Sequence, residues 1–229
     1  MFLGPQGWII FIIAMAAGLI TQSFVTSAYR KNSQTPLPSG LTGAAVARRV
    51  LDAEGLSGVA IEMTPGKLTD HYDPRADVLR LSADVYHGQH VAAAGIAAHE
   101  AGHAVQHARG YVPARLRMSL VPVANIGSQG GPILVMLGLV LGFGSSFSTM
   151  LVDLGILLFA AAVLFQFVTL PVEIDASRRA LAGLTATGSV IPGQESGARS
   201  VLTAAALTYV ASALVSVLYL AQFIGLRRD

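Results

Sequence analysis

The chain has 229 residues, of which 53% are hydrophobic and only 12% are charged, and its mean hydropathy is +0.59. Soluble domains carry about 25% charged residues, so this composition excludes an ordinary soluble enzyme and indicates that lipid forms part of the solvent. The formal net charge of +2 does not favour a nucleic-acid partner, and the absence of cysteine excludes disulfide bonds and cysteine-ligated zinc.

The first predicted element is a membrane span at residues 8–28. No Lys, Arg, Asp or Glu precedes Arg30, and the uncharged run can cross a hydrocarbon core about 30 Å thick, which needs about 20 helical residues. A secretory signal peptide would begin with a basic segment and end in a small-residue cleavage site. Neither is evident, so we expect an uncleaved span.

The next segment, residues 30–117, is polar and holds ten of the 15 basic residues and all six histidines. It begins with a linker rich in Pro, Ser and Asn at residues 32–40. A helix is expected after Thr42, whose side chain can cap it, and through Glu54, with Gly55 as the stop.

Two short strands and a second helix are expected in the rest of this segment. Residues 59–63 alternate between apolar and polar, and a second strand near residues 78–82 follows a turn at residues 73–77. An alanine-rich helix is expected from about Gln89 to Ala108. We expect the strand at 78–82 to be the edge that holds an extended substrate.

Three further spans are expected at residues 122–143, 151–171 and 204–225. The cluster of Gly, Ser, Gln and Pro at residues 127–132 predicts a break or kink near the start of the second span. A short polar turn at residues 144–149 joins the second and third spans into an antiparallel hairpin.

The clearest chemistry lies in His99, Glu100 and His103, within the predicted alanine-rich helix. A spacing of four residues places both imidazoles on one helix face, where the two nitrogens can bind one Zn²⁺ at about 2.1 Å. Glu100 can reach the open coordination position and take a proton from zinc-bound water, which is the arrangement of metalloproteases. Small neighbours such as Gly102 allow other elements to approach closely, whereas a bland amphipathic helix would leave surface histidines without a partner.

A catalytic zinc needs a third protein ligand and an open position. His107 continues the histidine face, but on a straight helix it lies two turns from His99, too far to bind the same ion. A carboxylate is therefore expected, and Glu173 and Asp175 are the candidates, because a carboxylate at a span end is unfavourable without a partner and zinc would supply one. The alternative is an ion-pair cluster with the arginines that follow, at the membrane surface.

Together these residues resemble the YugP-like family of bacterial membrane zinc metallopeptidases, and more distantly the HtpX-type and CAAX-prenyl-type membrane peptidases. The resemblance covers nearly the whole chain and rests on four motifs, Leu41–Ala44, Leu68–Arg75, His99–His107 and Leu170–Leu181. It implies a zinc-dependent endopeptidase of gluzincin-like type, with one Zn²⁺ per chain, in the bacterial cytoplasmic membrane.

The same resemblance implies that Glu173 is the third metal ligand, beside His99 and His103. The distant relatives carry this ligand in a Glu-x-x-Ala-Asp motif, and Glu173-Ile174-Asp175-Ala176-Ser177 aligns with it. The departure is Ser177, which stands where those relatives have Asp. Asp175 or Arg178 is then the candidate to support the ligands in its place.

The remaining histidines are weighed separately. His71 is a candidate catalytic residue, because it can stabilise the oxyanion or bind substrate; the alternative is that it only orders a turn. His87, His90 and His107 are expected to be solvated or to support the site from outside the ligand set.

The predicted fold is a mostly α membrane protein in which a four-helix transmembrane bundle is fused to a small α+β zincin-like domain that carries the HExxH helix. In chain order we expect the first span, the cytoplasmic zincin-like domain, the transmembrane hairpin, a cytoplasmic segment with the third metal ligand, and the fourth span with the C-terminus. These parts correspond to residues 1–29, 30–117, 118–172, 173–203 and 204–229.

Charge predicts the orientation. Residues 30–117 and 173–199 hold 13 of the 15 basic residues, whereas the first 29 residues and the turn at 144–149 hold none. Basic loops stay on the cytoplasmic side, so the active site is expected to face the cytoplasm and the N-terminus to lie outside. Arg227 and Arg228 oppose this assignment, because four spans send them outside.

Two other functions compete with a peptidase. A metal transporter would need ligands near the bilayer midplane, but all six histidines lie between residues 71 and 107, outside every predicted span. A non-enzymatic membrane scaffold with a structural zinc would fill all four coordination positions with protein ligands. The expected partners are a peptide or protein substrate, membrane proteins included, and the lipid bilayer, without nucleic acid.

Overall fold

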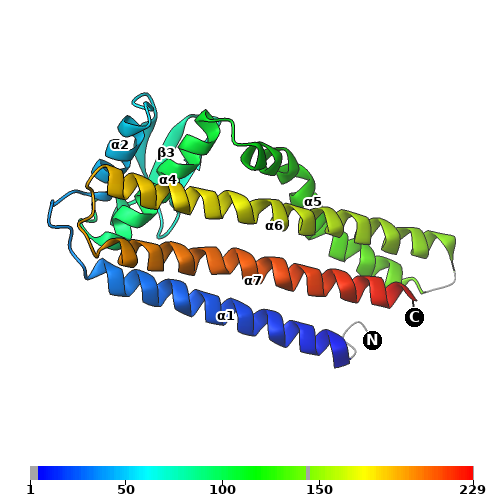
Figure 1. Cartoon of the computed structure of the whole chain (residues 1–229). Coiled ribbons are helices and arrows are strands. Elements are labelled where there is room, and N and C mark those ends of the chain that lie inside the picture. Colours follow the sequence, from blue (N-terminus) through cyan, green and yellow to red (C-terminus); the bar gives the residue numbers. More distant parts are fainter. Residues whose placement is uncertain (1–4, 143–144, 229) are drawn as a thin grey trace. The chain divides into compact units, whose positions relative to one another are not determined.

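The computed structural model describes residues 5–142 and 145–228, which are mostly helical with a small mixed sheet (Figure 1). The mostly helical prediction is therefore confirmed. In chain order the elements are α1 Pro5–Ser33, α2 Gly43–Ala53, β1 Ala60–Thr64, β2 His71–Asp73, β3 Val78–Ser82, α3 Ala83–Tyr86, α4 Val91–Ala108, α5 Val112–Val140, α6 Ser146–Ala186 and α7 Glu195–Arg228.

Helices α1, α5, α6 and α7 are long and apolar enough to cross a membrane, as expected. Helix α5 continues through residues 127–132, so a break there is excluded, whereas the alternative of a kink stays a prediction; Pro122 and Pro132 lie within the helix. Helix α6 begins at Ser146, which leaves a shorter connection than the predicted turn, and residue 144 of that turn lies outside the described residues.

Helix α6 is the longest element, with 41 residues. At 1.5 Å per residue it is about 60 Å long, about twice the thickness of a hydrocarbon core. It does not end where the predicted third span ends, because the helix continues past Pro171. The segment that follows Pro171 is therefore helical as far as Ala186.

The chain forms two compact units. The first, here called the helical unit, comprises residues 1–20, 115–170 and 208–229. The second, here called the sheet unit, comprises residues 21–114 and 171–207 and contains the three strands with α2, α3 and α4. The candidate site residues all belong to the sheet unit.

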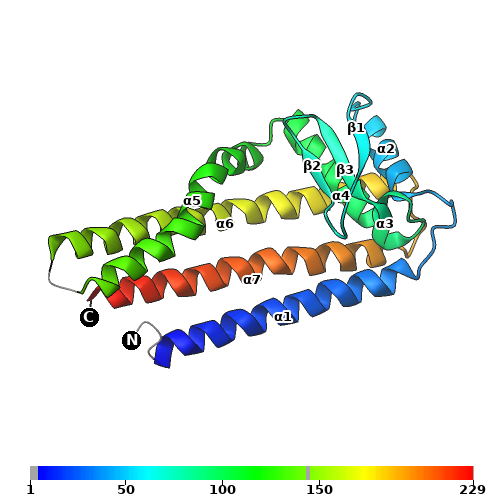
Figure 2. The same cartoon turned by 180° about the vertical axis from the view of Figure 1, so that it is seen from behind.

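The sheet has the order β1-β3-β2, visible from the back in Figure 2. Strand β1 is parallel to β3, and β2 is antiparallel to β3 with His71 opposite Arg80. Strand β3 is thus central, and the expectation that it forms a free edge for substrate is wrong. The unexpected strand is β2, whose three residues pair with β3 across the short turn at residues 74–77.

Helices α2 and α4 form the core of the sheet unit, together with β3 and α3. Helix α2 matches the prediction, since the Thr42 hydroxyl accepts a hydrogen bond from the Ala45 amide at 3.2 Å and Gly55 adopts φ +76° after the helix. The apolar side chains meet in one cluster around Val46, Leu51, Leu79, Leu81 and Val85, all fully buried. This core fixes α4, which carries the two candidate histidine ligands.

Candidate metal centre

Helix α4 is a nearly fully buried rod of small residues. Its alanines pack into the core on several sides, while His99 and His103 remain partly exposed on one face. His90 caps its start, because its Nδ1 accepts a hydrogen bond from the Ala93 amide at 3.1 Å. Gly110, with φ +63°, follows its end. The packed and capped helix therefore holds the backbone of His99 and His103 in fixed positions.

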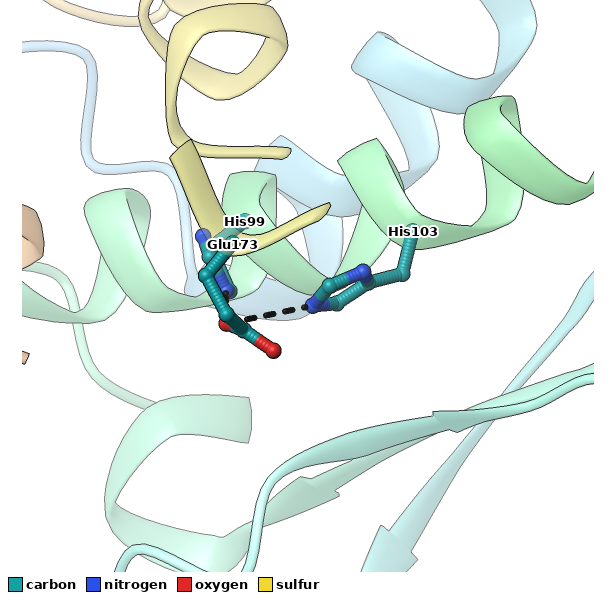
Figure 3. Close-up of side chains that lie close together, drawn as sticks. All are labelled: His99, His103 and Glu173. Carbon is teal, nitrogen blue, oxygen red and sulfur yellow. Dashed lines mark hydrogen bonds and ion pairs between the residues drawn. The ribbon is translucent and has the colours of Figure 1, made fainter. Parts of the chain in front are cut away.

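His99, His103 and Glu173 converge in space (Figure 3). Their nearest ligand atoms all lie within 4.8 Å of one another. The Glu173 Oε2 atom is 3.2 Å from His99 Nε2 and 3.7 Å from His103 Nε2. The Glu173 carboxylate belongs to α6 and is only 3% exposed. Two helices far apart in sequence thus present two nitrogens and one oxygen to a common point.

Gly102 allows α6 to come this close. A β-carbon placed on Gly102 would lie 2.6 Å from the carbonyl oxygen of Ala176, which is shorter than side chains tolerate. Ala176 itself is fully buried and lies three residues after Glu173. The glycine between the two histidines therefore sets the separation of the helices, and through it the position of the carboxylate.

Gln106 fixes the orientation of the His103 ring. The Gln106 amide nitrogen donates to the carbonyl oxygen of Val172 at 2.8 Å and to Asp175 Oδ2 at 3.0 Å, both of which only accept. Its amide oxygen must then face His103 Nδ1, 3.0 Å away, so that nitrogen carries the proton and Nε2 is left to face Glu173. Metal-binding histidines are oriented in the same manner.

Asp175 supports this arrangement from outside the ligand group, through Gln106. Its carboxylate is 3% exposed and accepts hydrogen bonds from Arg178 and from Arg179, the latter at 2.6 Å. The chain of contacts therefore runs from the arginines through Asp175 and Gln106 to His103. Asp175 contributes to the site through Gln106, whereas Glu173 faces both imidazoles directly.

Ser177 holds the other imidazole. Its hydroxyl lies 3.2 Å from His99 Nδ1, and this contact leaves His99 Nε2 to face Glu173. Ser177 stands at the position where the distant relatives have Asp. A hydroxyl in place of a carboxylate keeps a polar contact to the ring and adds no second negative charge beside Glu173.

The geometry calls for a cation between these groups. With the His103 proton on Nδ1, an unprotonated Nε2 would direct its lone pair at the Glu173 carboxylate. Burial lowers the pKa of His103, but the hydrogen bond and charge of Glu173 outweigh burial, so its pKa is raised on balance. A proton or a metal ion satisfies the same point, and two imidazoles with one carboxylate are a donor set that zinc prefers.

Glu100 lies beside this group, on the side of β2. Its side chain is largely buried, and its Oε2 atom accepts a hydrogen bond from the Tyr72 amide at 3.1 Å. That amide points away from β3, so the outer edge of β2 faces the catalytic candidate. The edge strand beside Glu100 is therefore β2, in place of the predicted edge at β3.

His107 and His71 lie outside the ligand group. Because the Tyr72 hydroxyl donates its proton to Asp77 at 2.7 Å, it accepts from His107 Nδ1 at 3.0 Å. His107 thus ties β2 to α4. His71 is exposed in β2, and its Nδ1 donates to the Thr69 carbonyl at 2.8 Å, so any role in catalysis stays a prediction.

Sequence reasoning did not find Gln106, Tyr72 or the contact of Ser177. A glutamine three residues after a histidine is a common pattern on any helix, and its role depends on how α6 approaches. The contact of Tyr72 depends on the sheet. The only sequence signal for Ser177 was its place in the aligned motif.

Comparison with known proteins gives a family match and a curated relative. The family described as “Putative neutral zinc metallopeptidase” matches residues 7–228. A curated relative, “Putative membrane protease YugP” of Bacillus subtilis (strain 168), is 46% identical over 217 residues, which are 94% of each chain. No solved structure gives a significant match.

Proposed function

The chain belongs to the family described as “putative neutral zinc metallopeptidase”, and from this membership we propose that it is a membrane-embedded, zinc-dependent endopeptidase with Glu100 as general base. The membrane part of the proposal is supported by the relative named as a membrane protease and by four helices long and apolar enough to span a bilayer. The domain with the HExxH helix is proposed to be zincin-like.

The observation that carries the proposal is the convergence of His99, His103 and Glu173. We assign them as the ligands of one zinc ion per chain. The donor set fits, since both Nε2 atoms face the carboxylate while each Nδ1 contacts another side chain. Glu173 lies deep enough to make an uncompensated negative charge unfavourable, so a bound cation stabilises it.

The proposed reaction needs a Lewis acid and a group that transfers a proton. Zinc, when bound, supplies a Lewis acid that polarises the scissile carbonyl and lowers the pKa of water toward neutrality. Glu100, adjacent to His99 on α4, takes the proton of the attacking water and delivers it to the leaving amine. A positioned acid–base group of this kind contributes about 10²–10⁴-fold to the rate.

Strand β2 is the proposed substrate-binding edge. Its Tyr72 amide donates to Glu100, so this edge lies within reach of the catalytic side chain, and a substrate strand would replace Glu100 as the partner of that amide. An extended peptide added to this edge would place its backbone beside Glu100 through main-chain hydrogen bonds. His71, on the same strand, is the candidate to stabilise the oxyanion.

A non-enzymatic scaffold with a structural zinc is the competing proposal. Structural zinc sites are closed by four protein ligands, and catalytic sites keep one position open. Within the described residues, the group able to hold a metal has three members, which favours an open position. A transporter is not favoured, because His99 and His103 belong to α4, which is not among the candidate spans.

We propose that the sheet unit faces the cytoplasm, in the bacterial cytoplasmic membrane. Of the 15 basic residues, 13 lie in residues 30–117 and 173–199. Arg227, which forms an ion pair with Asp153 within the helical unit, and Arg228 oppose this orientation. Two terminal basic residues weigh less than the 13 that flank the earlier spans.

The test separates metal binding from catalysis. Purified protein is given a proteome-derived peptide library, cleavage is read by mass spectrometry, and zinc is measured by elemental analysis. We expect cleavage by the wild type that a chelator stops and zinc restores. Glu100→Gln should keep wild-type zinc content and lose at least about a hundredfold in rate. Near wild-type cleavage by Glu100→Gln would exclude the mechanism, and zinc without cleavage in the wild type would favour the scaffold.

A further inference from the structure

A groove between α1 and α7, within the sheet unit, is not used by the proposed catalytic site. Its volume is about 440 Å³ and its α1 wall is formed at helical spacing by Phe24, Ser27, Ala28 and Lys31. The α7 wall is formed by Ser196, Arg199, Ser200, Thr203, Ala204 and Leu207. One face of each helix therefore lines the groove, and the ends of the two helices lie side by side in both views (Figures 1 and 2).

The groove is amphiphilic along its length. Lys31 is near the end of α1 and Ser196 and Arg199 are near the start of α7, so the cations gather at one end. Phe24 and Leu207, 55% and 41% exposed, line the other end. The groove therefore changes from basic and hydroxyl-rich to apolar over about two helical turns.

The basic end carries more positive than negative charge, with Glu195, one turn before Arg199 on α7, as the acidic residue nearest to it in sequence. Lys31 and Arg199 are exposed, and the described residues give neither of them an ion-pair partner. The lining includes no acidic residue. The helix dipole of α7 adds partial positive charge at its start. A negatively charged group with several hydrogen-bond acceptors fits this end, where serine and threonine hydroxyls also lie.

The surroundings identify the occupant. Both walls belong to helices that can span a membrane, and the most apolar 18-residue window of α1 has no buried residue among those described. We propose that this groove is a binding site for one anionic phospholipid, whose phosphate lies between Lys31 and Arg199 and whose acyl chains follow Phe24 and Leu207. Bound lipid then holds α1 against α7. A second copy of the chain or a substrate helix would match the apolar end but leave the two cations unpaired.

The experiment measures binding and does not depend on peptidase activity. The full chain is reconstituted in nanodiscs of phosphatidylcholine with and without phosphatidylglycerol, and retained lipid is identified by native mass spectrometry. We expect phosphatidylglycerol to be retained selectively and to raise the unfolding temperature. Lys31→Gln and Arg199→Gln should each lower its affinity about fivefold, as for one basic residue near an anionic membrane surface. Lys31→Arg, which keeps the positive charge, should bind phosphatidylglycerol with wild-type affinity.

Arg30 supplies the matched control, because it precedes Lys31 on α1, is also exposed and does not line the groove. Arg30→Gln should leave affinity unchanged. An equal loss from Arg30→Gln and Lys31→Gln would mean that only general surface charge attracts lipid. The site is also excluded if phosphatidylcholine is retained equally, if inorganic phosphate at the lipid concentration stabilises the protein to the same extent, or if a second chain is retained in place of lipid.

Discussion

Glycines bring helices into backbone contact in both units, but the contacts have different consequences. In the helical unit, Gly127 and Gly131 of α5 lie against backbone oxygens of α6, those of Leu158 and Gly155. In the sheet unit, Gly102 of α4 lies against the carbonyl oxygen of Ala176. The first contact repeats at a spacing of four residues, as in glycine-rich interfaces of membrane helices. The second contact, at Gly102, sets the position of the Glu173 carboxylate.

The surroundings explain the difference. Lipid tails are as apolar as the side chains they contact, so helices in a bilayer associate through close packing, and large apolar residues such as Ile133 and Leu157 remain 65% and 68% exposed. The sheet unit instead buries a continuous core that includes Leu79 and Leu184, both fully buried. Removal of apolar side chains from water stabilises this unit. The close contact at Gly102 is therefore not needed for its stability and can instead set the position of the Glu173 carboxylate.

The largest predicted difference between the units is in accessibility. Single cysteines replace Ser57 in the sheet unit and Ser146 at the start of α6, both exposed, and an impermeant thiol reagent is applied to intact cells. The cytoplasmic orientation predicts labelling at residue 146 and none at residue 57. Permeabilised cells, in which both must react, supply the control. Labelling at residue 57 alone would reverse the orientation.

The next largest effect is expected at Glu173. Substitutions beside metal ligands cost about 10–100-fold in affinity, so removal of a ligand should cost more than a hundredfold. We expect that loss for Glu173→Ala, measured by competition with a chromophoric chelator. Asp175→Ala, which disturbs the site only through Gln106, is the comparison and should cost less. The ligand assignment is wrong if Glu173→Ala binds zinc like the wild type while Asp175→Ala or His107→Ala does not.

A smaller effect is expected at Gln106. Gln106→Leu removes the acceptor for His103 Nδ1 and leaves the Val172 carbonyl and Asp175 each without one donor. We expect zinc affinity to fall about 10–100-fold. Thr185→Ala, at an exposed position on α6, controls for helix changes in general. Unchanged zinc affinity in Gln106→Leu would show that the ring of His103 needs no support from this side chain.

How much of this could be predicted from sequence depends on the distance over which each feature is determined. Helix α2 was predictable because Thr42 and Gly55 act on adjacent backbone, and the facing of His99 and His103 follows from helical spacing; their rings are 4.8 Å apart. Strand β2 was not predicted, although only the turn at residues 74–77 separates it from β3, because three residues are too few to show an alternating pattern. The pairing of His99 with Glu173, 74 residues apart, came from resemblance to a family and not from spacing.

Helix α6 also extends past the predicted end of the third span, for a physical reason. Pro171 lies within the helix and removes one backbone hydrogen bond, which disfavours continuation. In the structure the helix continues, because the following turns pack Val172, Ala176 and Ala180 into the sheet unit, all nearly fully buried. The free energy of this tertiary packing exceeds the local cost of the proline.

The smallest predicted effects come from alanine at the close glycines, and they test the comparison directly. Gly102→Ala places a β-carbon 2.6 Å from the Ala176 oxygen, and Gly131→Ala places one 2.9 Å from the Gly155 oxygen. Each should cost about 1–3 kcal/mol from overpacking. We expect Gly102→Ala to lower zinc affinity several-fold, because it displaces the turn that carries Glu173, and Gly131→Ala to lower stability at unchanged zinc affinity.

Matched controls lie on the same helices. Gly95 on α4 has its nearest neighbour at 3.5 Å, and Gly130 on α5 has its nearest at 4.0 Å, so alanine fits at both. Alanine is favoured over glycine in a helix by about 1 kcal/mol, and both controls should therefore be neutral or stabilising. Thermal unfolding and chelator competition on all four variants give the answer. If Gly131→Ala weakens zinc as much as Gly102→Ala, the close contacts do not have separate roles, because the position of the carboxylate would then depend on packing in both units.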